Sequence, residues 1–200
     1  MSVFEIRDRR AERFAATRQE ILEAAWRLAR TEGLVSFAMR DLGAAVGMRA
    51  QSLYAYFPSK HAMYDAMFAE ANLDLLSRVQ AVEAPDPVAA LRAHGRTFVQ
   101  FCVEDPVRYQ LLFQRTIPGF EPSAESYAVA MAVLAVARAA VAACNIKGTR
   151  AFDAWTALTG GLAAQQNANE PGGGRWVRLL DDLVDMYVTH YRKPAGRGRP

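Results

Sequence analysis

Apolar residues recur every three or four positions along most of the chain, the spacing expected for one face of an α-helix. The first clear stripe consists of Ile21, Ala25, Leu28 and Ala29, and it stops at Gly33, a residue suited to ending a helix. Strand-like alternation is rare, and alanine often stands where a sheet would favour β-branched residues. The pattern therefore predicts an all-α protein.

Turn-forming residues divide this pattern into successive candidate helices. The predicted helices cover 17–32, 39–46, 49–57, 60–84, 88–104, 106–116, 122–145, 150–169 and 175–192. Ser59 is suited to cap the helix that begins at Lys60. The sequence Ala-Pro-Asp-Pro at 84–87 breaks the pattern, so we expect a second domain after it.

The two short helices at 39–46 and 49–57 are matched to each other. Each has two apolar residues four positions apart: Leu42 and Val46 on the first, Leu53 and Phe57 on the second. Gly43 permits close approach of the two backbones, and Gly47 supplies the turn between them. This arrangement is a helix-turn-helix, in which the second helix can enter the major groove of DNA.

The second helix of this pair has polar residues on the face that its apolar residues leave free. They are Arg49, Gln51, Ser52, Tyr54 and Tyr56. Arginine can bond to guanine and glutamine to adenine, while hydroxyl groups reach phosphates or either base type. Lys60 adds a cation at the next helix start, suited to a phosphate. The alternative is an ordinary solvated face of a helical adaptor or enzyme.

The formal charge of +3 is distributed unevenly along the chain. Residues 1–60 carry a net charge of +3, residues 61–191 carry −4, and residues 192–200 carry +4. We interpret this as a basic head, an acidic body and a basic tip that meet different partners.

Other chemical signals are weak. Cys102 and Cys144 lie in apolar surroundings without a metal-ligand pattern, so we expect buried free thiols and neither a metal nor a cofactor. The charged N-terminal sequence is unlike a signal peptide, and the apolar run at 127–137 is interrupted by Arg138. We therefore expect a cytoplasmic protein with no membrane partner.

The run LGAAVGMRAQSLYAYFPSKHAMYDAM at 42–67 closely resembles the N-terminal DNA-binding domain of TetR-family transcriptional regulators. The resemblance extends over about 15–75 and rests on the glycine turn, the Leu-Tyr-Ala-Tyr-Phe sequence at 53–57 and Lys60. It implies a three-helix DNA-binding head with a helix-turn-helix, followed by a helical ligand-binding and dimerisation bundle.

The resemblance also assigns roles to individual residues of the head. It implies DNA contacts by Arg40, Arg49, Ala50, Gln51, Ser52, Tyr54, Tyr56 and Lys60, with Lys60 as a phosphate clamp. This sequence has Ala38 where the family usually has a threonine that caps the first helix of the motif. Losing such a cap costs about 0.5–2 kcal/mol of helix stability.

The basic segments at the two ends have open interpretations. Arg7, Arg9, Arg10 and Arg13 form an arm that either follows the DNA duplex into a minor groove or is a solubilising tail. The tip at 193–200 alternates cations with glycine and proline, which predicts a flexible tail.

The body is expected to bind an apolar or aromatic small-molecule effector and to form a homodimer, as the resemblance implies. The residues expected to line the effector pocket are Phe98, Phe101, Tyr109, Phe113, Tyr127, Met131 and Trp155, and the alternative for each of them is that it fills the core. The expected dimer interface consists of Leu158, Gly161, Leu162, Gln165, Leu179, Leu183 and Met186.

Together these observations predict a sequence-specific, ligand-responsive repressor that binds a palindromic DNA operator as a dimer. The expected segments are a basic arm (1–14), a helix-turn-helix domain (15–60), a connecting helix (61–84), an effector and dimerisation domain (85–192) and a tail (193–200). A helical adaptor for an acidic protein is the main alternative. An all-α enzyme is disfavoured because the chain has no HExxH motif, no nucleophile elbow and no phosphate-binding glycine loop.

Overall fold

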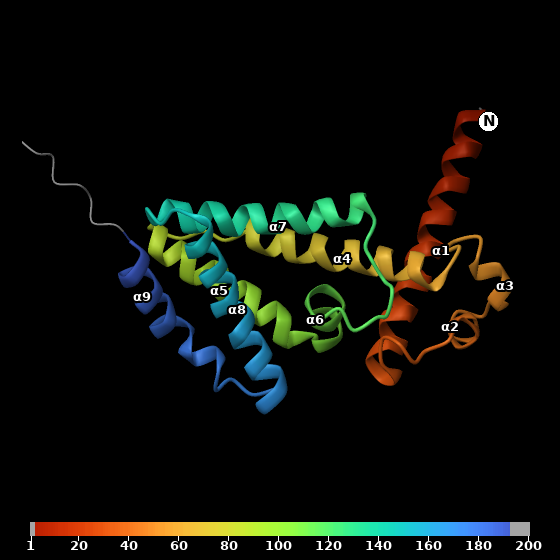
Figure 1. Ribbon diagram of the computed structural model, residues 1–200. Coiled ribbons are helices and arrows are strands. Elements are labelled where there is room, and N and C mark those ends of the chain that lie inside the picture. The colour runs from red at the N-terminus through yellow and green to blue at the C-terminus, as the bar shows by residue number, and fades with distance from the viewer. Residues whose placement is uncertain (1–2, 193–200) are drawn as a thin grey trace, which may run out of the picture. The chain divides into compact units, whose positions relative to one another are not determined.

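The computed structural model describes the backbone of residues 3–192 and the side chains of residues 9–192, and every regular element in this part is a helix (Figure 1). In chain order the helices are α1 (Val3–Glu32), α2 (Met39–Ala45), α3 (Ala50–Leu53), α4 (Lys60–Gln80), α5 (Pro87–Glu104), α6 (Pro106–Phe113), α7 (Ala124–Ala143), α8 (Thr149–Asn169), the 3-10 turn η1 (Val177–Leu179) and α9 (Leu180–Tyr191). The prediction of an all-α fold is confirmed.

Several helix boundaries differ from the predicted ones. The segment expected to be a separate arm is helical from Val3, so it continues directly into α1. The Arg7 side chain and the predicted tail 193–200 lie outside the described residues. The second helix of the motif spans only Ala50–Leu53 instead of 49–57, because the N–H groups of Ala55 and Tyr56 bond three residues back, to Ser52 and Leu53, in a tighter turn. The last predicted helix starts later, at Leu180, after a 3-10 turn.

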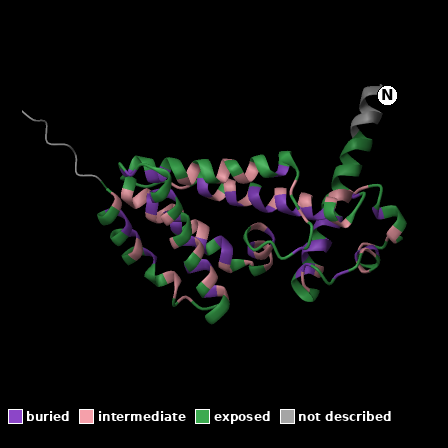
Figure 2. Cartoon of the chain, in the orientation of Figure 1, coloured by how far each residue is buried: buried purple, intermediate pink, exposed green. Residues whose placement is uncertain are grey.

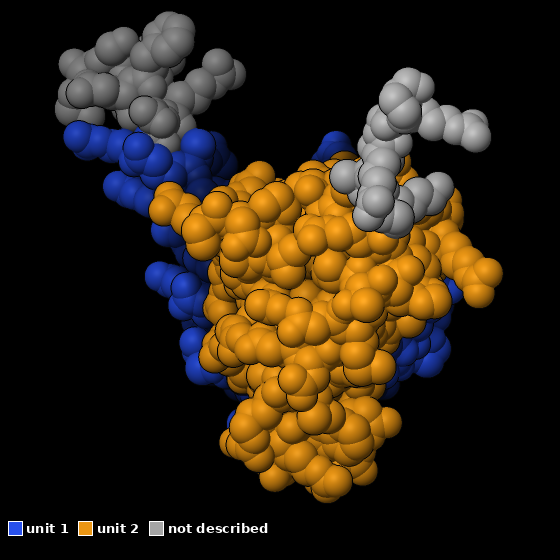
Figure 3. All heavy atoms as spheres, turned by 90° about the vertical axis from the view of Figure 1, so that its left-hand side faces the viewer, with its two compact units in different colours: residues 1–70, 110–126 blue, residues 71–109, 127–200 orange. Residues whose placement is uncertain are grey.

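The chain forms two compact units, coloured separately in Figure 3. Unit 1 comprises residues 1–70 and 110–126, and unit 2 comprises 71–109 and 127–200. The division differs from the expected domains because it falls inside the continuous helix α4, and because residues 110–126 join the N-terminal unit.

Unit 1 is built around the first half of α4. The buried Tyr64 hydroxyl donates a hydrogen bond to the carbonyl of Leu34, and burial raises the pKa of Tyr64 to about 12. The ring of Phe120, from the loop before α7, lies 5.8 Å from that of Tyr64. Nearby, the Asp65 carboxylate accepts hydrogen bonds from the backbone N–H and the hydroxyl of Ser123, at 2.7 and 2.9 Å. These contacts fix the loop before α7 to the N-terminal unit.

Unit 2 has its core between α5, α8 and α9. Gly95 makes room for the Trp155 indole, since a Cβ atom at Gly95 would lie 3.0 Å from its ring. The Trp155 and Tyr187 rings lie 5.4 Å apart, and the Tyr187 hydroxyl donates to the carbonyl of Ala151. Large aromatic residues thus fill the contact between these helices.

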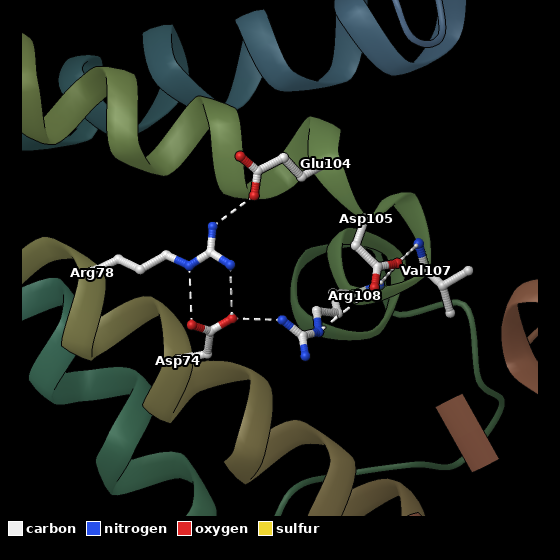
Figure 4. A network of polar contacts seen from close by, with 6 residues as sticks. All are labelled: Asp74, Arg78, Glu104, Asp105, Val107 and Arg108. Carbon is white, nitrogen blue, oxygen red and sulfur yellow. Dashed lines mark hydrogen bonds and ion pairs between the residues drawn. The ribbon is translucent and has the colours of Figure 1, made fainter. Parts of the chain in front are cut away.

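Charged residues connect α4 with the corner between α5 and α6, all within unit 2 (Figure 4). The Asp74 carboxylate accepts hydrogen bonds from Arg78 Nε at 3.0 Å, Arg78 Nη2 at 3.1 Å and Arg108 Nη1 at 2.6 Å. Arg78 also donates to Glu104, and Asp105 accepts from the backbone N–H groups of Val107 and Arg108 at the start of α6. Asp74 is therefore the shared acceptor for both arginines.

We expect the substitution Asp74→Asn to lower the free energy of unfolding by about 1–2 kcal/mol. The amide keeps the shape of the side chain but leaves Arg108, whose side chain is 19% exposed, without the charge of this carboxylate. Urea denaturation measures the effect. The exposed Glu83 provides the control, and Glu83→Gln should change stability by less than about 0.5 kcal/mol. Equal effects of the two substitutions would contradict a structural role for Asp74.

Helix α7 is largely exposed or half-buried, as Figure 2 shows. It is long and apolar enough to cross a membrane by length and composition alone, with a mean hydropathy of 1.8 in a window of which 17% is buried. This property is not evident from a search for an uncharged apolar run, because Arg138 interrupts the run. The Arg138 guanidinium lies 4.0 Å from the centre of the Phe152 ring, so it packs on α8.

Candidate nucleic-acid interface

The helix-turn-helix consists of α2, a turn and the single-turn helix α3. Leu42, Leu53 and Phe57 are almost completely buried, as the spacing predicts. A Cβ atom at Gly43 would lie only 2.7 Å from the carbonyl oxygen of Met48, and Gly47 has φ +67°. The predicted roles of these two glycines, close approach and the turn, are confirmed.

The polar side chains expected to face DNA surround this buried contact, and most of them are exposed. Arg49, Gln51 and Ser52 are exposed, and Tyr54 is 49% exposed although it is a large aromatic residue. The Arg40 side chain is 87% exposed and forms an ion pair with Asp41. These five predicted residues form the candidate DNA-binding surface.

Ala50 and Tyr56 have other surroundings from those predicted. Ala50 is half-buried, and its backbone lies next to Gly43, so it belongs to the contact between the two helices. The half-buried Tyr56 ring stacks on Phe14 of α1, with the ring centres 4.6 Å apart and an angle of 20° between the planes. Both residues therefore contribute to packing within the head.

Lys60, which is predicted to clamp a phosphate, contacts backbone carbonyls of the protein in this structure. Its ammonium group donates hydrogen bonds to the carbonyls of Val35, at 2.8 Å, and Phe37, at 2.5 Å. It lies 4.5 Å from the centre of the Phe37 ring, a cation–π contact, and burial lowers the pKa of Lys60. The side chain is thus turned toward the chain segment that precedes α2.

Helix α2, which follows these carbonyls in the chain, begins without a side-chain cap. The N-cap residue Ala38 has extended backbone and provides no side-chain hydrogen bond, as its sequence predicts. The ammonium group of Lys60 bonds to the carbonyls of Val35 and Phe37, which lie just before α2 in the chain. Ser59, in contrast, accepts a hydrogen bond from the N–H of Ala62 and caps α4 as expected.

Helix α1 contributes two residues to the motif that the sequence analysis did not identify. Besides the contact of Phe14 with Tyr56, the guanidinium of Arg18 lies 4.6 Å from the centre of the Phe57 ring. Phe14 precedes Ile21 by seven positions, so it continues the apolar stripe of α1. That spacing was available in the sequence, but the charged residues around it suggested an arm.

The residues expected to line an effector pocket have different environments. Phe101, Tyr109 and Trp155 are buried and Phe98 is half-buried. Phe113, Tyr127 and Met131 are 43%, 52% and 47% exposed, so their side chains lie at the surface in this structure. Helical periodicity predicted their apolar faces, but it could not show which faces remain uncovered.

Six of the seven residues expected at a dimer interface are at least partly accessible. Gly161, Gln165, Leu179 and Met186 are exposed, and Leu158 and Leu183 are half-buried. Leu162 is 4% exposed and belongs to the core of unit 2, so its expected place at the interface is wrong.

A helix-turn-helix with an exposed polar second helix, joined to a helical body, defines a DNA-binding regulator. Residues 21–67 match the family model described as bacterial regulatory proteins, tetR family. Residues 21–67 are therefore a TetR-type N-terminal DNA-binding domain. No curated protein matches the chain by sequence.

Solved structures of regulators share the fold. The TetR-family regulator PfmR from Thermus thermophilus is 20% identical, with 84% of this chain and 97% of that chain covered and a TM-score of 0.65. A TetR-family regulator from Streptomyces coelicolor is 18% identical, with coverages of 85% and 80% and a TM-score of 0.65. AibR, solved with isovaleryl coenzyme A and operator DNA, is 23% identical, with coverages of 84% and 96% and a TM-score of 0.62.

Proposed function

We propose that this regulator binds a partly palindromic DNA operator as a homodimer and releases it when a small-molecule effector binds. The observation that carries the proposal is the exposed polar surface around α3, formed by Arg49, Gln51, Ser52 and Tyr54 above the buried Leu53 and Phe57. Arginine and glutamine bond to base edges in the major groove, and hydroxyl groups position the protein on phosphates.

The dimer is part of this proposal because α3 is short. One turn of helix reads few bases, whereas two copies can read half-sites about 34–36 Å apart on one duplex. The accessible residues of α8 and α9, including Gly161, Leu183 and Met186, support a contact between two copies through these helices. The small residue at 161 would permit close helix approach.

A small-molecule effector is supported by the separate body and by related proteins. AibR was solved with isovaleryl coenzyme A, and a TetR variant from Acinetobacter baumannii AYE with minocycline. For this chain we expect an apolar or aromatic ligand, because the body is rich in aromatic residues. To move operator occupancy from 99:1 to 1:99, the effector must prefer the released state by about 5.5 kcal/mol. Acting on DNA, the protein would work in the bacterial cytoplasm.

The test begins with selecting operator fragments from a random duplex library with the purified protein. We then expect Gln51→Ala to weaken binding to the selected operator by about 5- to 150-fold, because a bidentate contact to a base is lost. Binding to random duplex should be unchanged. Fluorescence anisotropy measures both affinities.

The exposed Gln19 on α1 supplies a matched control, since Gln19→Ala makes the same chemical change away from α3. Its operator affinity should equal that of the wild type. An unchanged affinity for Gln51→Ala would contradict the assigned surface. Wild-type binding to duplex without steep salt dependence would instead favour an adaptor for an acidic protein.

A further inference from the structure

One face of α1 contacts the helix-turn-helix through residues that precede the match to the family model in the chain. Helix α1 begins at Val3, whereas the match begins at residue 21. Arg10, Phe14 and Arg18 are spaced by four residues, so they lie along one face of the helix. The same face continues into the buried Ile21 and Ala25. We call Arg10, Phe14 and Arg18 the α1 row.

Two members of the α1 row contact the segment that follows α3. Phe14 stacks on Tyr56 at 4.6 Å, and Arg18 lies over Phe57 at 4.6 Å. Toward the N-terminus of α1, the row passes from Arg18, which contacts the buried Phe57, to Phe14, which contacts the half-buried Tyr56. Arg10 is one helical turn farther, about 6 Å along the axis, and is exposed.

The contacts of the α1 row matter because α3 has little support of its own. It is four residues long, and its N-cap Arg49 makes no side-chain capping hydrogen bond. A helix this short depends on tertiary packing for its position. The Phe14–Tyr56 stack packs against the turn directly after α3, and it does so at the surface, since Phe14 is 45% exposed.

We propose that the α1 row extends the DNA interface, with Arg10 bonding to a backbone phosphate beside the bases read by α3 and Phe14 positioning the recognition turn through Tyr56. The inference rests on the proposed function. We assign a phosphate contact to Arg10 because phosphate oxygens line the outside of a duplex on both sides of the groove. A guanidinium group binds such oxygens through two parallel hydrogen bonds. The exposed Arg9 and Arg13 add positive charge to the same helical turns.

The role of Arg10 is tested by the salt dependence of DNA binding. Arg10→Gln should lower the slope of log affinity against log salt by about 0.9, because one phosphate contact and its released counterion are lost. The loss should be the same on operator and on random duplex. Arg27, exposed on the opposite face of α1, is the control, and Arg27→Gln should keep the wild-type slope. A wild-type slope for Arg10→Gln would overturn this part of the proposal.

The role of Phe14 is tested by the ratio of operator to random-duplex affinity. Phe14→Ala should lower this ratio about three- to tenfold and leave the salt slope unchanged, because Tyr56 loses its aromatic partner but no cation is removed. Phe14→Tyr should restore the ratio. A general loss of folding would weaken both affinities together and would overturn the positioning role, as would an unchanged ratio.

Failure of the α1 row and failure of the proposed function give different results. If the wild-type protein binds no duplex, the proposed function fails before any variant is compared. If the wild type binds its operator and both variants bind as it does, only the α1 row is refuted.

Discussion

Gly43→Ala is expected to disrupt operator binding and to lower the free energy of unfolding by about 1–3 kcal/mol. The new methyl group would lie 2.7 Å from the Met48 carbonyl oxygen and 3.2 Å from the Ala50 backbone nitrogen. Both neighbours are backbone atoms, so α2 and the turn into α3 must move apart. Anisotropy titration and thermal unfolding measure the two consequences.

The same substitution at another helical glycine separates this effect from helix propensity. Gly160, inside α8, has no atom within 4 Å of an added Cβ. Gly160→Ala should therefore keep operator affinity and raise stability by about 0.4–1 kcal/mol through the unfolded state. If Gly43→Ala behaved in this way too, the close contact between α2 and α3 would be refuted.

Lys60→Met is expected to destabilise the protein by about 2–3 kcal/mol, because two hydrogen bonds from a charged donor are lost. The methionine side chain keeps a similar length but can neither bond to the carbonyls of Val35 and Phe37 nor make the cation–π contact with the Phe37 ring. Urea denaturation measures the loss. The exposed Lys147 gives the control, and Lys147→Met should stay within about 0.5 kcal/mol of the wild type.

Salt dependence distinguishes the two possible roles of Lys60. With the ammonium group on carbonyls, Lys60→Met should keep the wild-type salt slope of DNA binding even where affinity falls. A phosphate clamp would instead lower the slope by about 0.9. A stable variant with a reduced slope would therefore show that this ammonium group contacts DNA.

The sequence predicted the parts of the head that depend on spacing and backbone conformation. Leu42, Leu53 and Phe57 are buried where their period places them, and Gly33 has the positive φ of +92° expected at the end of α1. Such features follow from local geometry, since a face of a helix or a left-handed residue is specified by a few neighbouring positions.

Side-chain direction was harder to predict than helical position. Lys60 has a long, flexible side chain that can point to solvent or to the protein. Its orientation depends on carbonyls that lie 23 and 25 residues away in the chain. Tyr56 was placed on an outward face because its helix was expected to continue to Phe57. The chain instead leaves the helix after Leu53 in a tighter turn, and Phe14 supplies a partner for Tyr56 that lies far away in sequence.

Contacts between distant segments also explain the errors in the body. Helical periodicity places Trp155 and Met131 alike on the apolar faces of their helices. Trp155 is nevertheless buried, whereas Met131 is 47% exposed. The difference depends on which helices cover each face, which no local pattern contains.

The anchoring of residues 117–126 by Asp65 and the aromatic residues of α4 has a practical consequence for dissecting this regulator. The DNA-binding unit is assembled from two stretches of sequence, and a single cut after α4 would leave the second one behind. Tyr64 and Phe68 would then lose Phe120, their partner from that stretch. A fragment that ends after α4 would therefore lack part of the DNA-binding unit, because residues 110–126 also belong to it.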